Sequence, residues 1–98
     1  MILALLGPML RSAQGVPLER QQALVNLLRQ DCGSCHGMLL NGGLGPPLLP
    51  ESLASKSDED LVHAILDGRP GTAMPPWRDF LSASEAAWLV TQLRKNAP

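Results

Sequence analysis

The feature that most constrains this chain of 98 residues is a run of five, Cys32-Gly33-Ser34-Cys35-His36, which holds both of its cysteines. On a helical turn, two cysteines three positions apart lie on one side, so each can form a thioether with one of the two vinyl groups of a single haem. The adjacent histidine can reach the iron from that same side. This motif therefore predicts one covalent haem c, attached through Cys32 and Cys35 and ligated by His36.

Other uses of a cysteine pair fit the rest of the chain less well. A thioredoxin-like dithiol site is expected near a βαβ pattern, and the sequence shows no alternating strand pattern. A zinc site needs four ligands, and His63 is the only other obvious donor. A disulfide between Cys32 and Cys35 would close a very small loop and stabilise little. A dithiol or metal protein without haem stays open as the alternative interpretation.

The composition bounds the architecture and leaves room for a large cofactor. The chain is long enough for one domain and too short for a multidomain enzyme. Apolar residues make up 45% of it, but aromatic residues only 3%, namely Trp77, Phe80 and Trp88. A core with so few rings needs another large apolar body, which a haem would supply. A formal net charge of −1 leaves no basic excess, so nucleic acid is not an expected partner.

Three segments carry the signals of helices, at residues 17–31, 57–68 and 82–95. In the first, apolar residues recur at steps of three and four, and the segment runs directly into the motif. The second begins with a serine and three acidic residues and ends at a glycine. The third opens with Ser82 and Glu85 at the spacing of a capping box. Two loops rich in proline and glycine separate these segments, which predicts an all-α fold of three main helices and long, ordered loops wrapped around the haem.

The first residues predict an export signal. Residues 2–10 form an apolar run that is too short to cross a bilayer, which takes about 20 residues. Residues 13–15, Ala-Gln-Gly, fit the small-x-small rule of a cleavage site. We therefore predict a signal peptide at residues 1–15 and a mature domain at 16–98, exported to the periplasm and without a membrane span. No basic residue precedes the apolar run, so an apolar N-terminal tail is the alternative.

The opposite face of the iron needs a second ligand, and one methionine is well placed to supply it. Met1 and Met9 fall in the predicted signal peptide, and Met38 lies two residues after the ligating histidine, on its side. Met74 remains, in a loop stiffened by three prolines, and a rigid loop holds a weak thioether ligand well. Generic core packing is the alternative role for Met74. His63, a competing candidate ligand, is expected to be an exposed side chain of a helix.

Three side chains near Met74 are candidates for contacts with the haem propionates. Trp77 offers an indole N–H, and Arg69 and Arg78 offer guanidinium groups. Such donors would satisfy two carboxylates that are otherwise placed in a poorly solvated site. A packed tryptophan and two solvated arginines form the alternative.

Together these features resemble a class I monohaem cytochrome c over residues 18–96. The resemblance rests on the motif after an N-terminal helix, on the Met-Pro-Pro of residues 74–76 and on the final Leu-Ser-x-x-Glu helix. Residues 45–48, Gly-Pro-Pro-Leu, are similar to a family segment whose proline carbonyl accepts a hydrogen bond from the ligating histidine, which implies that role for Pro46. Residues 68–77 are similar to the small cytochrome c55X type, which is encoded with the periplasmic haem c/haem d nitrite reductase of denitrifying bacteria.

The resemblance implies an electron carrier and not an enzyme. If His36 and Met74 both bind the iron, no position is left for a substrate, and the haem exchanges electrons. The implied partners are redox proteins, with the nitrite reductase system as the recipient of the electrons. Two alternatives stay open: a redox helper in the maturation of the reductase's special haem, and a haem-based sensor in which a small ligand displaces Met74.

One contact departs from the family's pattern. The family commonly packs an aromatic residue of the C-terminal helix on a glycine of the N-terminal helix, and the corresponding positions here are Gln92 and Leu24. We expect Leu24 to fill the space and Trp88, one turn before Gln92, to supply the ring, because repacked cores conserve volume.

Overall fold

The computed structural model describes residues 15–96. The predicted signal peptide, apart from Gly15, lies outside the described residues, as do Met1 and Met9. Within the described residues, no helix has the length and hydropathy that a bilayer crossing requires.

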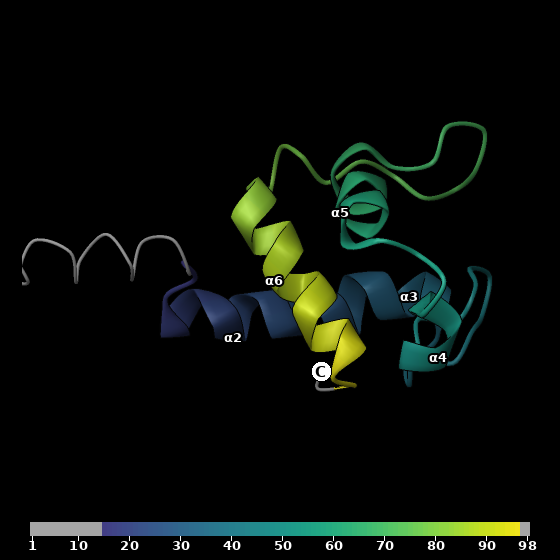
Figure 1. Ribbon diagram of the computed structural model, residues 1–98, viewed down its shortest axis with the longest axis horizontal. Helices are drawn as coiled ribbons and strands as arrows, with labels where there is room; N and C mark the ends of the chain where they lie inside the picture. The colour runs from purple at the N-terminus through teal and green to yellow at the C-terminus, as the bar shows by residue number, and fades with distance from the viewer. Residues whose placement is uncertain (1–14, 97–98) are drawn as a thin grey trace, which may run out of the picture.

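Helices and loops make up the described chain, which contains no strand between residues 15 and 96 (Figure 1). The predicted all-α fold is therefore confirmed. In chain order the elements are α2 (Leu18–Leu27), the π-helical segment η1 (Leu28–Cys32), α3 (Gly33–His36), α4 (Pro50–Leu53), α5 (Asp58–Asp67) and α6 (Ala83–Arg94).

The first helix is longer and less regular than predicted. The predicted helix ends at Asp31, whereas the helical chain runs on through η1 and α3 to His36. The amide of Gly33 bonds the carbonyl of Leu28, five residues back, which is the hydrogen bond of a π-helix. The motif is thus the last part of one helical rod, separated from α2 by a π turn.

The caps of the two later helices form as predicted. The Ser57 hydroxyl accepts a hydrogen bond of 3.1 Å from the Asp60 amide at the start of α5. At the start of α6, the Ser82 hydroxyl accepts from the Glu85 amide at 3.1 Å, and the Glu85 carboxylate accepts from the Ser82 amide at 2.9 Å. Gly68 ends α5 with a φ of 71°. Local capping signals therefore place both helices.

The core is aliphatic and is organised around α6, which packs against α2, α4 and α5 (Figure 1). Leu24 is completely buried, as expected, and Trp88 is half-buried against the core cluster that contains Leu24. The buried apolar residues are Leu24, Leu28, Leu40, Leu53, Leu61, Leu66, Leu81, Ala86, Leu89, Val90 and Leu93.

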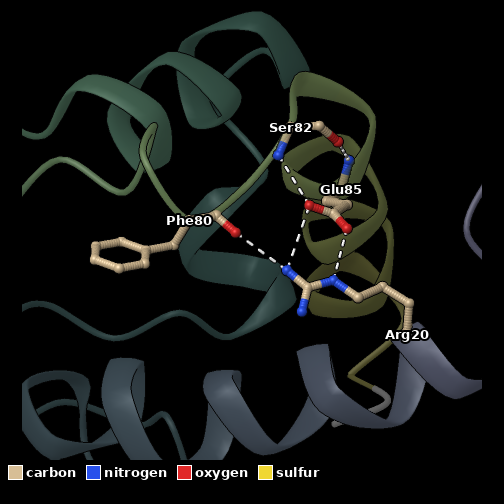
Figure 2. Close-up of polar contacts among 4 residues, drawn as sticks. All are labelled: Arg20, Phe80, Ser82 and Glu85. Carbon is tan, nitrogen blue, oxygen red and sulfur yellow. Dashed lines mark hydrogen bonds and ion pairs between the residues drawn. The ribbon is translucent and has the colours of Figure 1, made fainter.

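An ion pair ties α2 to the start of α6 (Figure 2). Arg20 donates from Nε to Glu85 Oε2 at 2.6 Å and from Nη2 to the Phe80 carbonyl at 3.1 Å. Because Glu85 also closes the capping box with Ser82, one carboxylate fixes the first turn of α6 and its contact with the N-terminal helix.

The leucine-rich segment after the motif, residues 39–53, is predicted to be a loop because it is rich in proline and glycine. Only part of it is a loop. Its last residues form the short helix α4, because Pro50 is suited to the first turn of a helix and Leu53 packs into the core. Leu40 is also buried, and its carbonyl accepts a hydrogen bond of 2.8 Å from the Leu48 amide. Leu39 and Leu44, by contrast, are 79% and 94% exposed.

Candidate haem-binding site

The two cysteines of the motif lie three residues apart at the end of the helical rod. Cys32 ends η1 and Cys35 lies in α3, and both are half-buried, free cysteines. Burial raises the pKa of Cys32 to about 11, and the nearby charges of Asp31 and Cys35 add to the effect. A thiol with so high a pKa is protonated at neutral pH, which argues against a reactive dithiol site.

The described residues do not provide the ligand set of a zinc site. No group of three or more His, Cys, Asp or Glu side chains between residues 15 and 96 is arranged to hold a metal ion. His63, the other donor considered, is 75% exposed on α5 and lies 2.8 Å from Asp67 Oδ2.

The ring of His36 is held by the loop that follows it. Its Nδ1 lies 2.7 Å from the carbonyl oxygen of Pro46, the contact that the family resemblance implies. A carbonyl only accepts hydrogen bonds, so Nδ1 carries the proton and the lone pair of Nε2 is available to a metal. This hydrogen bond fixes both the tautomer and the direction of the ring, as an axial ligand of haem requires.

Gly45 lets the same loop press against the histidine. A Cβ at this position would lie 2.9 Å from both Cε1 and Nδ1 of His36, closer than real side chains approach. The Gly45 amide donates to the Cys35 carbonyl at 2.7 Å, and the Gly42 amide donates to the His36 carbonyl at 2.8 Å. Sequence reasoning had not assigned Gly45 a role, although its position directly before Pro46 was the available signal.

Met74 is half-buried in a loop that closes on itself through hydrogen bonds. The Thr72 hydroxyl donates to the Arg69 carbonyl at 2.6 Å and accepts from the Met74 amide at 3.2 Å. The Arg69 amide donates in turn to the Met74 carbonyl at 3.2 Å. The prolines were the predicted source of stiffness; Thr72 adds a second one that sequence reasoning missed.

The Met74 loop begins and ends at the last turn of α5. At its start, a Cβ on Gly68 would lie 2.7 Å from the Met74 carbonyl, so only glycine permits this close approach. At its end, the Trp77 amide donates to Ile65 and Leu66 carbonyls at 3.0 and 3.1 Å. In Figure 1 this loop and the loop that holds His36 extend from the same end of the molecule.

Met38 packs close to the motif. A Cβ built on Gly33 would be 3.9 Å from Met38 Sδ, so Met38 lies over the turn between the two cysteines. It is 68% exposed.

The three candidates for propionate contacts have different surroundings. Trp77 is half-buried and packs edge-to-face on Phe80, with ring centroids 5.8 Å apart. Arg69 is exposed. Arg78 donates from Nε and Nη2 to the two carboxylate oxygens of Asp67, each at 2.8 Å. Asp67 is a partner that sequence reasoning did not assign to Arg78.

The residues therefore fit a covalent haem, and comparison with known proteins agrees. Residues 19–91 match the family model described as "Cytochrome C oxidase, cbb3-type, subunit III". A cytochrome c55X of Pseudomonas aeruginosa is 58% identical over 74 residues, which are 76% of this chain and 62% of that protein. A cytochrome c55X of Paracoccus denitrificans is 53% identical over 77 residues, which are 79% of this chain and 75% of that protein. This chain thus spans less than two thirds of the length of the first relative.

Two solved structures are similar to the described fold. The structure of a c-type cytochrome NirC has a TM-score of 0.81 and 54% identity, and the match covers 85% of this chain and all of that one. A dihydro-heme d1 dehydrogenase NirN in complex with DHE has a TM-score of 0.63 and 42% identity. That match covers 70% of this chain but 15% of the dehydrogenase, so the similarity is to one part of a larger protein.

Proposed function

We propose that this chain, which belongs to the cytochrome c family matched by residues 19–91 and groups with the cytochrome c55X proteins, is an exported one-electron carrier in denitrification. It binds one haem c covalently. That haem supplies a reversible one-electron couple. Ligation by histidine and methionine raises its reduction potential. The proposal includes a signal peptide at residues 1–15 and a mature periplasmic domain at 16–98.

The observation that carries this proposal is the hydrogen bond of 2.7 Å between His36 Nδ1 and the Pro46 carbonyl. It leaves the lone pair of Nε2 available to the iron, and it restrains the orientation of the imidazole ring. Cys32 and Cys35 supply the two thioethers from the same helical rod. One short stretch of chain thus fixes attachment, ligation and orientation.

Met74 is the proposed second axial ligand. Its half-buried side chain and self-bonded loop support this role, since a weak thioether ligand needs a loop that holds it in place. With both axial positions filled by protein, no open position remains for a substrate, so we infer that the chain has no catalytic activity of its own. Trp77 and Arg69 remain the proposed donors to the haem propionates, whereas the fork of Arg78 already has a carboxylate partner.

The proposed partner is the nitrite reductase system, to which the carrier would deliver electrons. A second candidate is a redox role in the maturation of that reductase's special haem. The similarity to part of a dihydro-heme d1 dehydrogenase favours this second candidate, because a related domain is built into a protein of that name.

Spectroscopy and one variant test the ligation. The oxidised holoprotein is expected to show the weak far-red charge-transfer band of sulfur bound to iron, and Met74→Ala should abolish it and lower the reduction potential while the haem stays attached. Boiling the holoprotein in denaturant tests the thioethers, because haem attached through them stays with the polypeptide and keeps it coloured. If the wild-type protein lacks this band and readily binds carbon monoxide, it is instead the haem-based sensor.

Stopped-flow mixing tests the partner. The reduced protein is mixed with nitrite reductase, which takes up electrons, and the oxidised protein is mixed with a dihydro-heme d1 dehydrogenase and its dihydro-haem, which give up electrons. Faster oxidation by the first supports the carrier, and faster exchange with the second supports the maturation role. Cell fractionation and N-terminal sequencing test export, with Val16 the expected first residue of the mature chain.

A further inference from the structure

An ion-paired cluster joins the two ends of the Met74 loop. Asp67 is the last residue of α5, one position before the loop begins, and Arg78 directly follows Trp77, where the loop ends. Both carboxylate oxygens of Asp67 accept from Arg78, each at 2.8 Å. The pair therefore closes the loop at its base, eleven positions apart in sequence.

The backbone at the base reinforces this closure. The Arg78 amide donates to the Leu66 carbonyl at 3.0 Å, next to Asp67. His63 adds a further contact, with Nδ1 2.8 Å from Asp67 Oδ2. The guanidinium of Arg78 holds the pKa of Asp67 below its usual range, so the carboxylate is ionised at neutral pH and can only accept hydrogen bonds.

We propose that Asp67 and Arg78 form a clamp that keeps the Met74 loop closed and so positions Met74 as an iron ligand. The proposal rests on the proposed ligation by Met74. Neither Asp67 nor Arg78 has a described hydrogen bond to His36 or Met74, so they are positioning residues that act through the loop between them.

The geometry gives the clamp more effect than an ordinary surface pair. The Asp67 side chain is 34% exposed and that of Arg78 59%, so a single contact would contribute little. The two hydrogen bonds between the guanidinium and the carboxylate, however, restrain both the separation and the relative orientation of the two side chains. Its loss should leave the helices intact and raise the fraction of molecules in which the loop is open.

An open loop exposes the iron to added ligands, which gives a direct measurement. The apparent affinity for an external ligand rises in proportion to the fraction of binding-competent molecules. We expect Asp67→Asn to raise the affinity of the oxidised holoprotein for imidazole roughly two- to fivefold, which is the upper part of the range for exposed ion pairs. Loss of the far-red band during an imidazole titration reports this binding.

The chain offers a matched control on the same helix. Asp58, in the first turn of α5, pairs with Arg94 at 2.7 Å and has no contact with the Met74 loop among the described bonds. Asp58→Asn should therefore leave the affinity for imidazole unchanged. An equal rise in Asp58→Asn and Asp67→Asn would overturn the clamp, because the effect would then follow from any lost pair on α5.

A double-mutant cycle separates the clamp from an independent role of Arg78. If the two residues act as a pair, Arg78→Gln has the effect of Asp67→Asn, and the double variant is no more affected than either one. Arg78→Lys, which keeps the charge but loses the fork, should fall between Arg78→Gln and the wild type. Additive effects would show that Arg78 acts elsewhere, for example on a propionate, and would overturn the pairing.

Amide hydrogen exchange tests the clamp without relying on the ligand. In Asp67→Asn, exchange should accelerate at the amides of Arg69, Thr72 and Met74, which bond within the loop, and stay unchanged at Leu61 in α5. A wild type without the far-red band contradicts the proposed ligation, and the exchange data then still decide on the clamp. Unchanged exchange in the loop overturns the clamp itself, even where the wild type shows the band.

Discussion

Two features position His36: the carbonyl of Pro46 and the absence of a side chain at Gly45. The sequence predicted the first and not the second. The role of Pro46 came from the resemblance to a family segment, and the structure has Nδ1 of His36 at 2.7 Å from its carbonyl. The need for glycine at residue 45 was not predicted, because it arises from how closely the returning loop approaches the imidazole ring. Such a distance is a property of the folded loop and not of a local pattern.

Substitution of Gly45 should therefore disturb the histidine. In Gly45→Ala the new methyl group would stand 2.9 Å from the ring, so the ring or the loop must shift. We expect a destabilisation of about 1–3 kcal/mol, typical of overpacking, and a weaker hydrogen bond from His36 Nδ1 to the Pro46 carbonyl. Denaturant unfolding and the reduction potential of the holoprotein measure the two effects.

Gly33→Ala is the matched control for that substitution. The nearest atom to a Cβ at residue 33 is 3.7 Å away, which is ordinary contact, and the residue is helical. Stability should stay the same or rise slightly, since alanine favours helices more than glycine does. Equal losses of stability in Gly33→Ala and Gly45→Ala would contradict the explanation from ring contact.

At the scale of elements, helix starts were predictable and the contacts between helices were not. Each helix cap of α5 and α6 is a contact between residues three positions apart, and both caps form at the expected serines. The pair of Arg20 and Glu85 joins residues 65 positions apart, so it depends on how α2 and α6 cross. The π turn was missed because steps of three and four along the chain do not reveal one extra residue.

The pair between α2 and α6 predicts a component of acid stability. The hydrogen bond from Arg20, followed by that from the Ser82 backbone, lowers the pKa of Glu85. A lowered pKa means that the folded state holds the ionised form more strongly than the unfolded chain does. This contribution is fully present above the unfolded value of about 4.3 and is lost as the pH falls through the lower folded value.

Glu85→Gln should therefore be less stable than the wild type at neutral pH and lose less stability on acidification. Urea unfolding of the holoprotein at a series of pH values between neutral and strongly acid measures the slope. Arg20→Gln should reduce the slope in a similar way, because it removes the largest cause of the shift. A full acid slope in both variants would mean that other carboxylates carry the pH dependence.

At the scale of the whole molecule, the shortage of aromatic residues is visible in the core. All the buried apolar side chains are aliphatic, and Trp77 and Trp88 are half-buried at the margin of the cluster. Three main helices around a covalent haem could be predicted from the motif, the capping signals and the low aromatic content. The short helix α4 and the exact path of the loops could not, because they depend on packing between distant segments such as Leu53 and α6.

Removal of the haem attachments should consequently unfold the domain. We expect the double variant Cys32→Ala, Cys35→Ala to lose cooperative unfolding and most of its resistance to proteolysis, since a small aliphatic core alone stabilises a domain poorly. Thermal unfolding followed by circular dichroism measures this. Ser34→Ala, in the same turn, keeps both attachments and should unfold like the wild type; a double variant that matched it would show that the haem is dispensable for the fold.

The π turn at Leu28–Cys32 has a consequence for the rotational phase of the helical rod. Each residue of an α-helix advances by about 100°, so one additional residue in a turn sets an angular offset between the segments on either side. The segment before the turn directs Leu24 into the core, and the segment after it carries Cys35 and His36. The π turn thus sets the angle between the buried face of α2 and the part of the rod that carries the haem-binding residues, so replacing it with a regular α-helical turn would rotate the motif relative to the core.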